Sequence, residues 1–384
     1  MLYNAMRFST KQITGIAVAI MLLTMAPLFS ARAQQPANSV HKRLLAYYRN
    51  QDQTNNPAYT AKEIPFEKLT HLIHVAITVD PSGNGEIKVS SYSIDRKLIS
   101  KAHAAKVRVL VCVQGPADAF SKVAANSEAR IHFAESLKSF ILKYQYDGVD
   151  IDWEVPQDQS DVSNDVLLMQ AIREALPAPQ YLVSMATSST PGHWGEYDFI
   201  HLTPIVDFYN IMTYDFHGHT SDHSGHNSPL FSNESDLGHH NSIDDSVSLY
   251  LNQFNVPPEK INVGMAFFGY EFPVGQLYTP CNCKGLIVSR QYGSYIKPRI
   301  GFGGWTQYLD PIAMTPYLVH STQPFGFITY DDPASIARKT AYALAVRNLG
   351  GVFMWELSQD FDGKKQDLLD SMHKTFESVE KQAR

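Results

Sequence analysis

Residues 147 to 154 read Asp147-Gly148-Val149-Asp150-Ile151-Asp152-Trp153-Glu154. Successive residues of a β-strand point to opposite faces, so the apolar side chains share one face and Asp150, Asp152 and Glu154 share the other. The carboxylates on this face recur about every 6.5 Å. Acids this close cannot all ionise easily when partly removed from water, so at least one should hold a proton near neutral pH. The stretch therefore favours an acid–base site.

The same stretch has a structural alternative and a family resemblance. The alternative is an edge strand whose acidic face meets solvent, although the flanking residues are typical of a buried strand. The pattern D-x-x-D-x-D-x-E resembles the signature of glycoside hydrolase family 18, the chitinases and their relatives, and all four acidic positions are filled. Cleavage of a glycosidic bond needs a proton donor on the leaving oxygen, which such a carboxyl group can supply.

Composition limits the class of protein. The 384 residues are 44% hydrophobic and 18% charged, which is ordinary for a globular chain with a large core. The formal charge is −6, and nucleic-acid binding needs a basic face, so we expect no nucleic-acid partner. Three cysteines are too few for a disulfide framework. Cys112 is expected to be a buried thiol, and Cys281 and Cys283 either form a bridge or stay free.

The N-terminus indicates export. Arg7 and Lys11 precede an apolar run over 13–29, and Ala31-Arg32-Ala33 fits a small-x-small cleavage site. We expect residues 1–33 to be a cleaved signal peptide, which sends the chain to the periplasm or outside the cell and leaves no membrane segment. An uncleaved anchor is the alternative, because the run has about the minimum length for a membrane span.

Short apolar runs alternate with helical periodicity along the chain. Eight strands are expected, at 44–48, 71–79, 107–113, 148–153, 182–186, 206–212, 261–267 and 351–355. Eight strands alternating with helices predict an α/β fold, a (β/α)8 TIM barrel, over 40–384. The chain is longer than the roughly 250 residues that such a barrel needs. We therefore expect a small insertion lobe at about 271–328, between strand seven and the last helix–strand unit.

Barrel enzymes carry their catalytic groups at the carboxyl ends of strands, where Glu154 falls. Tyr214 and Asp215 follow strand six and should lie at the same mouth. A tyrosine hydroxyl there can hold a substrate carbonyl, and Asp215 can bind a hydroxyl or acidify a neighbour. A loop tyrosine and a helix-capping aspartate are the alternative. The segments 212–218 and 225–230 resemble M-T-Y-D-F-H-G and G-H-N-S-P-L of family 18.

Aromatic residues are further candidates for the mouth. Trp355 ends the last strand, where its ring can stack on a sugar; a core tryptophan is the alternative. The resemblance, carried by L-G-G-x-x-x-W-E at 349–356, implies that Trp355 lies beneath the sugar being cleaved. Tyr47 matches a family tyrosine near the acidic motif. Trp194 and Trp305 are candidates either for sugar subsites or for simple packing.

Histidines gather after strand six, and they are His217, His219, His223, His226, His239 and His240. Imidazoles bind Zn²⁺, Cu²⁺ or Ni²⁺, but these spacings match no defined ligand set. The resemblance accounts for His217 and His226 without a metal. We therefore expect no metal site and no organic cofactor.

The resemblance extends from about residue 44 to residue 362, with departures in the walls of the site. The usual S-x-G-G after strand three is Cys112-Val113-Gln114-Gly115, so a thiol, a weaker hydrogen-bonding group, replaces the serine that bonds the middle acids. Y-A-F on strand two is Val75-Ala76-Ile77, Y-G-R on strand seven is Phe268-Gly269-Tyr270, and Thr220 lies near the place of an absent tryptophan. These changes bear on substrate preference and rate more than on reaction type.

The resemblance implies a hydrolase of β-1,4-linked N-acetylglucosamine polymers such as chitin, acting with retention and with help from the substrate. Glu154 would be the general acid, and Asp152 would orient the substrate's acetamido group. Asp150 would share a proton with Asp152, and Tyr214 would hold the acetamido oxygen. Asp147, whose side chain should point to the other face of the strand, would have a structural role. The residues expected to contact substrate are Trp355, Met212, Asp215 and Tyr47.

Two other functions are compatible with the pattern. A lectin-like binder of such oligosaccharides would suit the altered walls, but non-catalytic members typically lose Glu154 or a neighbouring acid, and this chain keeps them all. An endo-N-acetylglucosaminidase acting on N-glycan or peptidoglycan would differ in loops that set specificity. We expect a monomer whose partner is a chitin or N-acetylglucosamine-containing oligosaccharide.

Overall fold

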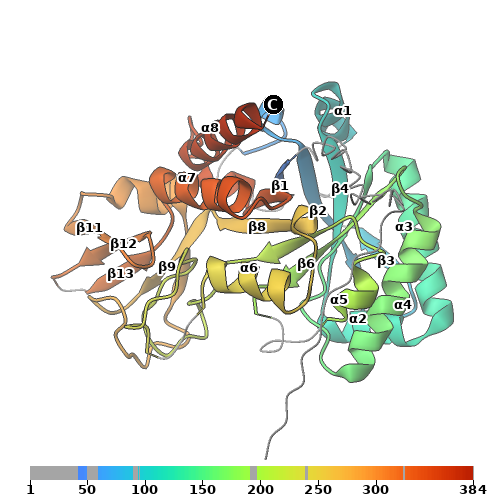
Figure 1. Cartoon of the computed structure of the whole chain (residues 1–384), viewed down its shortest axis with the longest axis horizontal. Helices are drawn as coiled ribbons and strands as arrows, with labels where there is room; N and C mark the ends of the chain where they lie inside the picture. The colour runs from blue at the N-terminus through green and yellow to red at the C-terminus, as the bar shows by residue number, and fades with distance from the viewer. Residues whose placement is uncertain are drawn as a thin grey trace, which may run out of the picture. The chain divides into compact units, whose positions relative to one another are not determined.

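The computed structural model describes residues 42–49, 59–89, 94, 96–190, 197–237, 241–322 and 325–383. Within them, eight parallel strands close into a barrel in the order β1-β14-β8-β7-β6-β5-β4-β2, with β2 pairing back to β1 (Figure 1). The expected (β/α)8 fold is confirmed. The barrel strands are β1 (Arg43–Arg49), β2 (His71–Val79), β4 (Arg108–Gln114), β5 (Gly148–Ile151), β6 (Leu182–Ser188), β7 (Phe208–Met212), β8 (Ile261–Ala266) and β14 (Gly351–Trp355).

Helices connect the barrel strands and cover the outside of the barrel. The helices are α1 (Arg96–Ala104), α2 (Ala117–Ala125), α3 (Ser127–Tyr144), α4 (Gln159–Ala175), α5 (Phe199–Leu202), α6 (Ile243–Asn252), α7 (Pro333–Ala341) and α8 (Asp367–Gln382). Polar side chains begin several of them. Asn126 accepts hydrogen bonds from two backbone N–H groups at the start of α3, and Asp332 forms a capping box at the start of α7.

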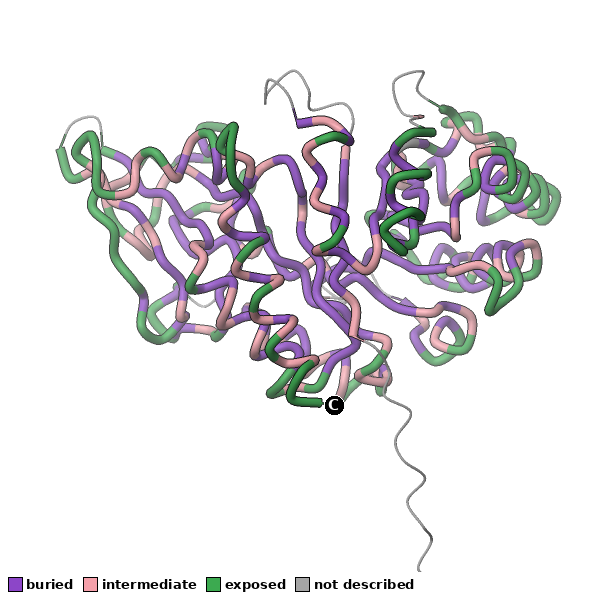
Figure 2. The backbone as a smooth tube through the Cα atoms, turned by 90° about the horizontal axis from the view of Figure 1, so that it is seen from above, coloured by how far each residue is buried: buried purple, intermediate pink, exposed green. Residues whose placement is uncertain are grey.

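The alternation of side chains along β5 separates its apolar residues from its acids. Val149 and Ile151 belong to the apolar layer between strands and helices, and Trp153 stacks on Phe120 of α2 with ring centroids 5.5 Å apart. Figure 2 shows the strands buried and the outer sides of the helices exposed. Because β5 pairs with β4 on one side and β6 on the other, the edge-strand alternative is wrong and the acids face the barrel interior.

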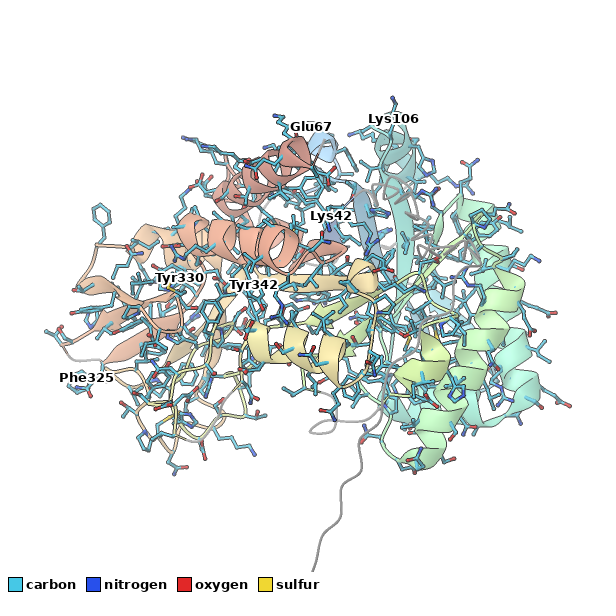
Figure 3. The ribbon with its side chains drawn as sticks, viewed as in Figure 1. Lys42, Glu67, Lys106, Phe325, Tyr330 and Tyr342 are labelled. Atoms are coloured by element: carbon cyan, nitrogen blue, oxygen red, sulfur yellow. A yellow bond between two sulfur atoms is a disulfide. The ribbon has the colours of Figure 1, made fainter. Side chains whose placement is uncertain are left out.

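A second sheet lies between β8 and α7 in the chain. Its five antiparallel strands have the order β10-β9-β13-β12-β11, and Phe325 marks its outer margin (Figures 1 and 3). The strands are β9 (Phe268–Phe272), β10 (Val288–Gln291), β11 (Trp305–Asp310), β12 (Thr315–His320) and β13 (Gly326–Thr329). The sequence indicates an insertion here but no strands, because glycines and prolines interrupt the alternation. A short antiparallel strand, β3 (Ile87–Val89), also extends the barrel sheet beside β2.

The three cysteines occur as one free thiol and one disulfide. Cys112 on β4 is a buried free thiol, as expected, and Cys281 and Cys283 are joined in a disulfide. Among the described helices, none combines the length and the apolar character needed to cross a membrane. The segment 1–33, Trp194, His239 and His240 lie outside the described residues.

Candidate active site

Three carboxylates lead from the barrel interior to its mouth at the carboxyl end of β5. Asp150 is fully buried, and Asp152 is 4% exposed. Glu154 is exposed and projects into a cleft, so solvent and ligands can reach it. Because side chains alternate along the strand, the three acids form a row in which exposure to water increases toward the mouth of the barrel.

Hydrogen bonds from three other strands hold the Asp150 carboxylate. Its Oδ2 accepts from the Tyr47 hydroxyl at 2.8 Å, and its Oδ1 accepts from Ser184 Oγ at 2.5 Å and from Asn210 Nδ2 at 3.1 Å. The strand register places two residues beside Asp150, because Cys112 on β4 and Ser184 on β6 are its partners in the adjacent strands. Burial raises the pKa of Asp150, and these hydrogen bonds act in the opposite direction.

The orientation of Asn210 is itself set by a neighbour. Asn262 on β8 donates from Nδ2 to Asn210 Oδ1 at 2.9 Å, and Arg43 Nε donates to Asn262 Oδ1 at 3.0 Å. Because the amide oxygen of Asn210 is engaged in this way, its NH₂ group is directed toward Asp150. A chain of polar groups thus runs from the half-buried Arg43, whose pKa is lowered to about 10 by desolvation, to the innermost acid.

Asp152 is less well supplied with donors. Gln114 Nε2 donates to its Oδ2 at 2.6 Å, whereas its Oδ1 is buried without a hydrogen-bond partner among the described residues. Burial raises the pKa of Asp152 well above its ordinary range, and the charges of Glu154 and Asp150 add to the rise. Asp152 is therefore the acid best suited to hold a proton near neutral pH, and its free oxygen can meet a donor or acceptor on a ligand.

Glu154 and Asp215 face the same cleft from two different strands. Partial burial raises the pKa of Glu154, and the Asp215 carboxylate adds to the rise. Asp215 Oδ1 in turn accepts from the Tyr270 hydroxyl at 2.8 Å, and its N–H donates to Asn227 Oδ1 at 2.8 Å. Tyr270 of β9 thus holds Asp215 from the insertion sheet.

Two adjoining cavities form the cleft. The inner one, of about 160 Å³, is lined by Tyr47, Asp152, Glu154, Ala186, Met212, Tyr214, Asp215 and Trp355. The outer one, of about 400 Å³, shares four of these residues and extends to Gln157, Ser188, Ser189 and Thr220. The Trp355 and Tyr47 rings lie 5.4 Å apart at the inner end. An aromatic surface opposite a row of carboxyl groups suits a sugar ring, which presents apolar faces and polar edges.

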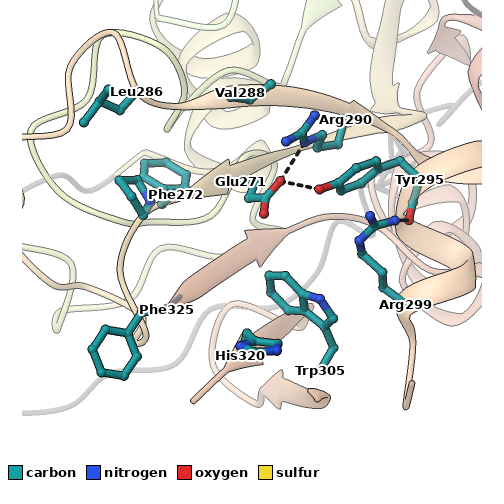
Figure 4. Close-up of a pocket in the computed structure, with 11 residues that line it drawn as sticks. Glu271, Phe272, Leu286, Val288, Arg290, Tyr295, Arg299, Trp305, His320 and Phe325 are labelled. Atoms are coloured by element: carbon teal, nitrogen blue, oxygen red, sulfur yellow. Dashed lines mark hydrogen bonds and ion pairs between the residues drawn. The ribbon is translucent and has the colours of Figure 1, made fainter. Parts of the chain in front are cut away.

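Two of the expected residues lie away from this cleft. Asp147 immediately precedes β5 at the opposite end of the barrel, where its Oδ2 accepts from Val109 N at 2.7 Å and pairs with His103 Nε2 at 2.9 Å. Trp305 lies in a separate pocket of about 370 Å³ on the insertion sheet (Figure 4). In that pocket Arg290 donates to Glu271 at 2.6 Å. Trp305 therefore does not line the cleft around Glu154.

Sequence reasoning missed the donors that support the acids, which are Gln114, Ser184, Asn210 and Tyr270. Ser184 and Asn210 carry a readable signal, because each is a polar residue between two apolar neighbours at an inward position of its strand. Gln114 and Tyr270 stand out in the sequence only as departures from the family pattern. Their contacts with Asp152 and Asp215 depend on how the strands are paired.

Several known proteins are similar to this chain. Residues 43–360 match the model of Glycosyl hydrolases family 18. Chitinase 1 of Aphanocladium album is 27% identical, covering 81% of this chain and 80% of its own length. Chitinase A1 of Niallia circulans is 32% identical over 65% of this chain, which spans only 40% of that protein.

Solved structures extend the comparison to three dimensions. A family 18 N-acetylglucosaminidase from Paenibacillus barengoltzii has a TM-score of 0.75 at 26% identity, covering 87% of this chain and 99% of its own. A mutant of catalytic domain 2 of Ostrinia furnacalis Group II chitinase, solved in complex with penta-N-acetylchitooctaose, has a TM-score of 0.79 at 25% identity. The match covers 88% of this chain and 97% of that domain.

The raised pKa of Asp152 predicts that Asp152→Asn stabilises the protein at alkaline pH. Ionisation of Asp152 is unfavourable in the folded state. It therefore lowers the free energy of unfolding as the pH rises through the folded-state pKa, and this loss is absent below the ordinary pKa of a carboxyl group. We expect the free energy of unfolding at pH 8 to be higher in Asp152→Asn than in the unaltered protein, with no such gain at pH 4. Urea denaturation at pH 4 and pH 8 measures the difference. Asp147→Asn, which removes a hydrogen-bonded carboxylate, is the control and should show no such gain; equal behaviour of the two variants would contradict the assignment.

Proposed function

The chain belongs to Glycosyl hydrolases family 18, and we propose that it cleaves β-1,4-linked N-acetylglucosamine polymers, chitin or chitooligosaccharides, with retention of configuration. Family membership makes it a glycoside hydrolase of the chitinase type. The observation that carries the proposal is the row of acids ending in Glu154, with the buried Asp152 behind it and Tyr214 and Trp355 in the same cavity.

In the first step Glu154 acts as the general acid. Its raised pKa keeps a fraction of the carboxyl group protonated near neutral pH, and its exposed position lets it reach the oxygen between two sugars. Protonation of that oxygen releases the leaving sugar while positive charge develops at the anomeric carbon. The wider outer cavity beyond Glu154 offers room for the sugar on one side of the cleaved bond.

The substrate's own acetamido oxygen serves as the nucleophile in this proposal. Asp152 Oδ1 is buried and has no hydrogen-bond partner among the described residues, so it suits the acetamido N–H. The hydroxyl of Tyr214, whose side chain lines the same cavity, then holds the acetamido oxygen against the anomeric carbon. A ring closed by the acetamido group carries positive charge, which the neighbouring carboxylates stabilise.

The second step reuses Glu154 as a base. After giving up its proton, Glu154 accepts one from a water molecule that attacks the anomeric carbon and opens the acetamido ring. Asp150 supports both steps from beneath, because its hydrogen bonds oppose the rise in its pKa and so favour the proton that the two acids share on Asp152. Trp355 and Tyr47 form the floor under the sugar, Met212 lines the wall, and Asp215 binds a hydroxyl.

Glu154→Gln should lower kcat on chitooligosaccharides by about 10²–10⁴-fold or more, because the amide cannot donate the proton. Binding should persist, since glutamine keeps the size and hydrogen-bonding capacity of glutamate. Product release measured by mass spectrometry and affinity measured by calorimetry separate the two effects. Glu271→Gln, in the separate pocket of the insertion sheet, is the matched control and should keep its rate. Unchanged hydrolysis by Glu154→Gln would refute the general-acid role, and binding without turnover by the unaltered protein would favour a lectin-like function.

Acetamido participation predicts that N-acetyl groups on the substrate are essential. Fully deacetylated oligomers of the same length should be cleaved at a small fraction of the rate, because no carbonyl oxygen is present to attack the anomeric carbon. Parallel incubation with acetylated and deacetylated oligomers, peptidoglycan and N-glycopeptide, read by mass spectrometry, measures this dependence and the substrate range. Equal rates on both oligomers would exclude the mechanism while leaving glycosidase activity intact.

Export is also part of the proposal. A basic start, an apolar run over 13–29 and Ala31-Arg32-Ala33 are typical of a cleaved signal peptide. The exported chain should therefore begin at Gln34, which N-terminal sequencing of the mature protein measures. A mature chain that still contains residues 13–29 would indicate an anchor instead.

A further inference from the structure

Two histidines and one aspartate converge in the loop that follows β7. His217 Nε2 and His223 Nε2 lie 3.0 Å apart, and Asp236 Oδ1 lies 2.9 Å from His223 Nε2 and 3.3 Å from His217 Nε2. All three side chains are almost completely buried. Three polar atoms have thus been brought to the corners of a small triangle inside the protein.

The other nitrogen of each ring shows which atoms carry the protons. His217 Nδ1 lies 3.1 Å from the carbonyl oxygen of His226, and His223 Nδ1 lies 2.6 Å from Asp222 Oδ1. Carbonyl and carboxylate oxygens only accept hydrogen bonds, so both Nδ1 atoms donate. In the neutral rings both Nε2 atoms therefore present lone pairs toward each other and toward the Asp236 carboxylate. Three such acceptors at these distances repel one another unless a cation, either a proton or a metal ion, lies between them.

We propose that His217, His223 and Asp236 bind one divalent transition-metal ion of the zinc type. Zinc takes histidine nitrogen and carboxylate oxygen at about 2.0–2.2 Å in tetrahedral geometry, which places its ligand atoms about 3.3 Å apart. The three separations lie within about 0.4 Å of that spacing. The hydrogen bonds at both Nδ1 atoms are the supports that metal-bound histidines usually have.

The environment of this His–His–Asp site supports a metal with a structural role. A cavity of about 220 Å³ is lined by both histidines, together with Asp215 and Thr220 of the catalytic cleft, and offers a path for the ion and a place for a fourth ligand. Cys281 N donates to the Asp222 carbonyl oxygen at 2.8 Å, which joins the loop to the insertion sheet. A metal would therefore fasten the loop bearing Asp215, without touching the reacting atoms. His239 and His240 lie outside the described residues.

The test uses the mature chain purified with a tag that contains no histidine. The protein is stripped with a chelator, loaded with ZnCl₂ or CoCl₂ and passed over chelating resin. We expect about one zinc per chain by elemental analysis, a thermal midpoint raised by a few degrees, and a Co²⁺ visible spectrum of the intense four-coordinate kind. A stripped protein that retains no zinc, or a weak octahedral Co²⁺ spectrum, would overturn the proposal independently of any variant.

Variants then locate the ion. Asp236→Asn and His223→Gln should each retain less than a tenth of the zinc and lose the thermal shift. Asp222→Asn, which weakens the acceptor for His223 Nδ1, should weaken zinc binding by about 10–100-fold. His201→Gln is the control, because His201 pairs with Asp198 on the surface and should keep full binding. Zinc retained equally by Asp236→Asn and His201→Gln would overturn the assignment to this site.

Discussion

The burial of Asp150 inside the barrel is the constraint on which the site depends. A carboxylate removed from water is costly unless donors replace its hydration. Here the donors come from Tyr47, Ser184 and Asn210 on three different strands, and Asn210 is oriented through Asn262. A shift of any one strand by a single residue would turn its donor to the other face, so the charge and the strand register stabilise each other.

The three acids differ in the number of hydrogen bonds that they accept, and this difference affects their pKa values. Asp150 is surrounded by donors, Asp152 has one donor and a buried oxygen without a partner among the described residues, and Glu154 reaches the cleft. Burial raises the pKa of all three, but the hydrogen bonds oppose this rise most strongly at Asp150. These differences favour a proton on Asp152 and Glu154, which line the cleft, over a proton on Asp150.

The loop after β7 and the insertion sheet together complete the mouth of the barrel. Tyr270 of β9 donates to Asp215, and Asn227 farther along the loop accepts from the Asp215 N–H. Gln114 and Tyr270 each support an acid of the cleft, since they donate hydrogen bonds to Asp152 and Asp215. The His–His–Asp site lies on the same loop, so the proposed metal would stabilise the wall that carries Asp215.

The local periodicity of the sequence predicts the barrel, the place of Glu154 at its mouth and the inward direction of Asp150 and Asp152. This is possible because strand and helix patterns depend on only a few consecutive residues. The partners of those acids were not predictable in this way. Ser184 is 34 residues from Asp150 and Asn210 is 60, and these side chains meet only because adjacent strands take a particular register. The same holds for His217, His223 and Asp236, whose spacing along the chain matches no ligand pattern. Their convergence depends on the path of a loop, which long-range packing decides rather than local sequence.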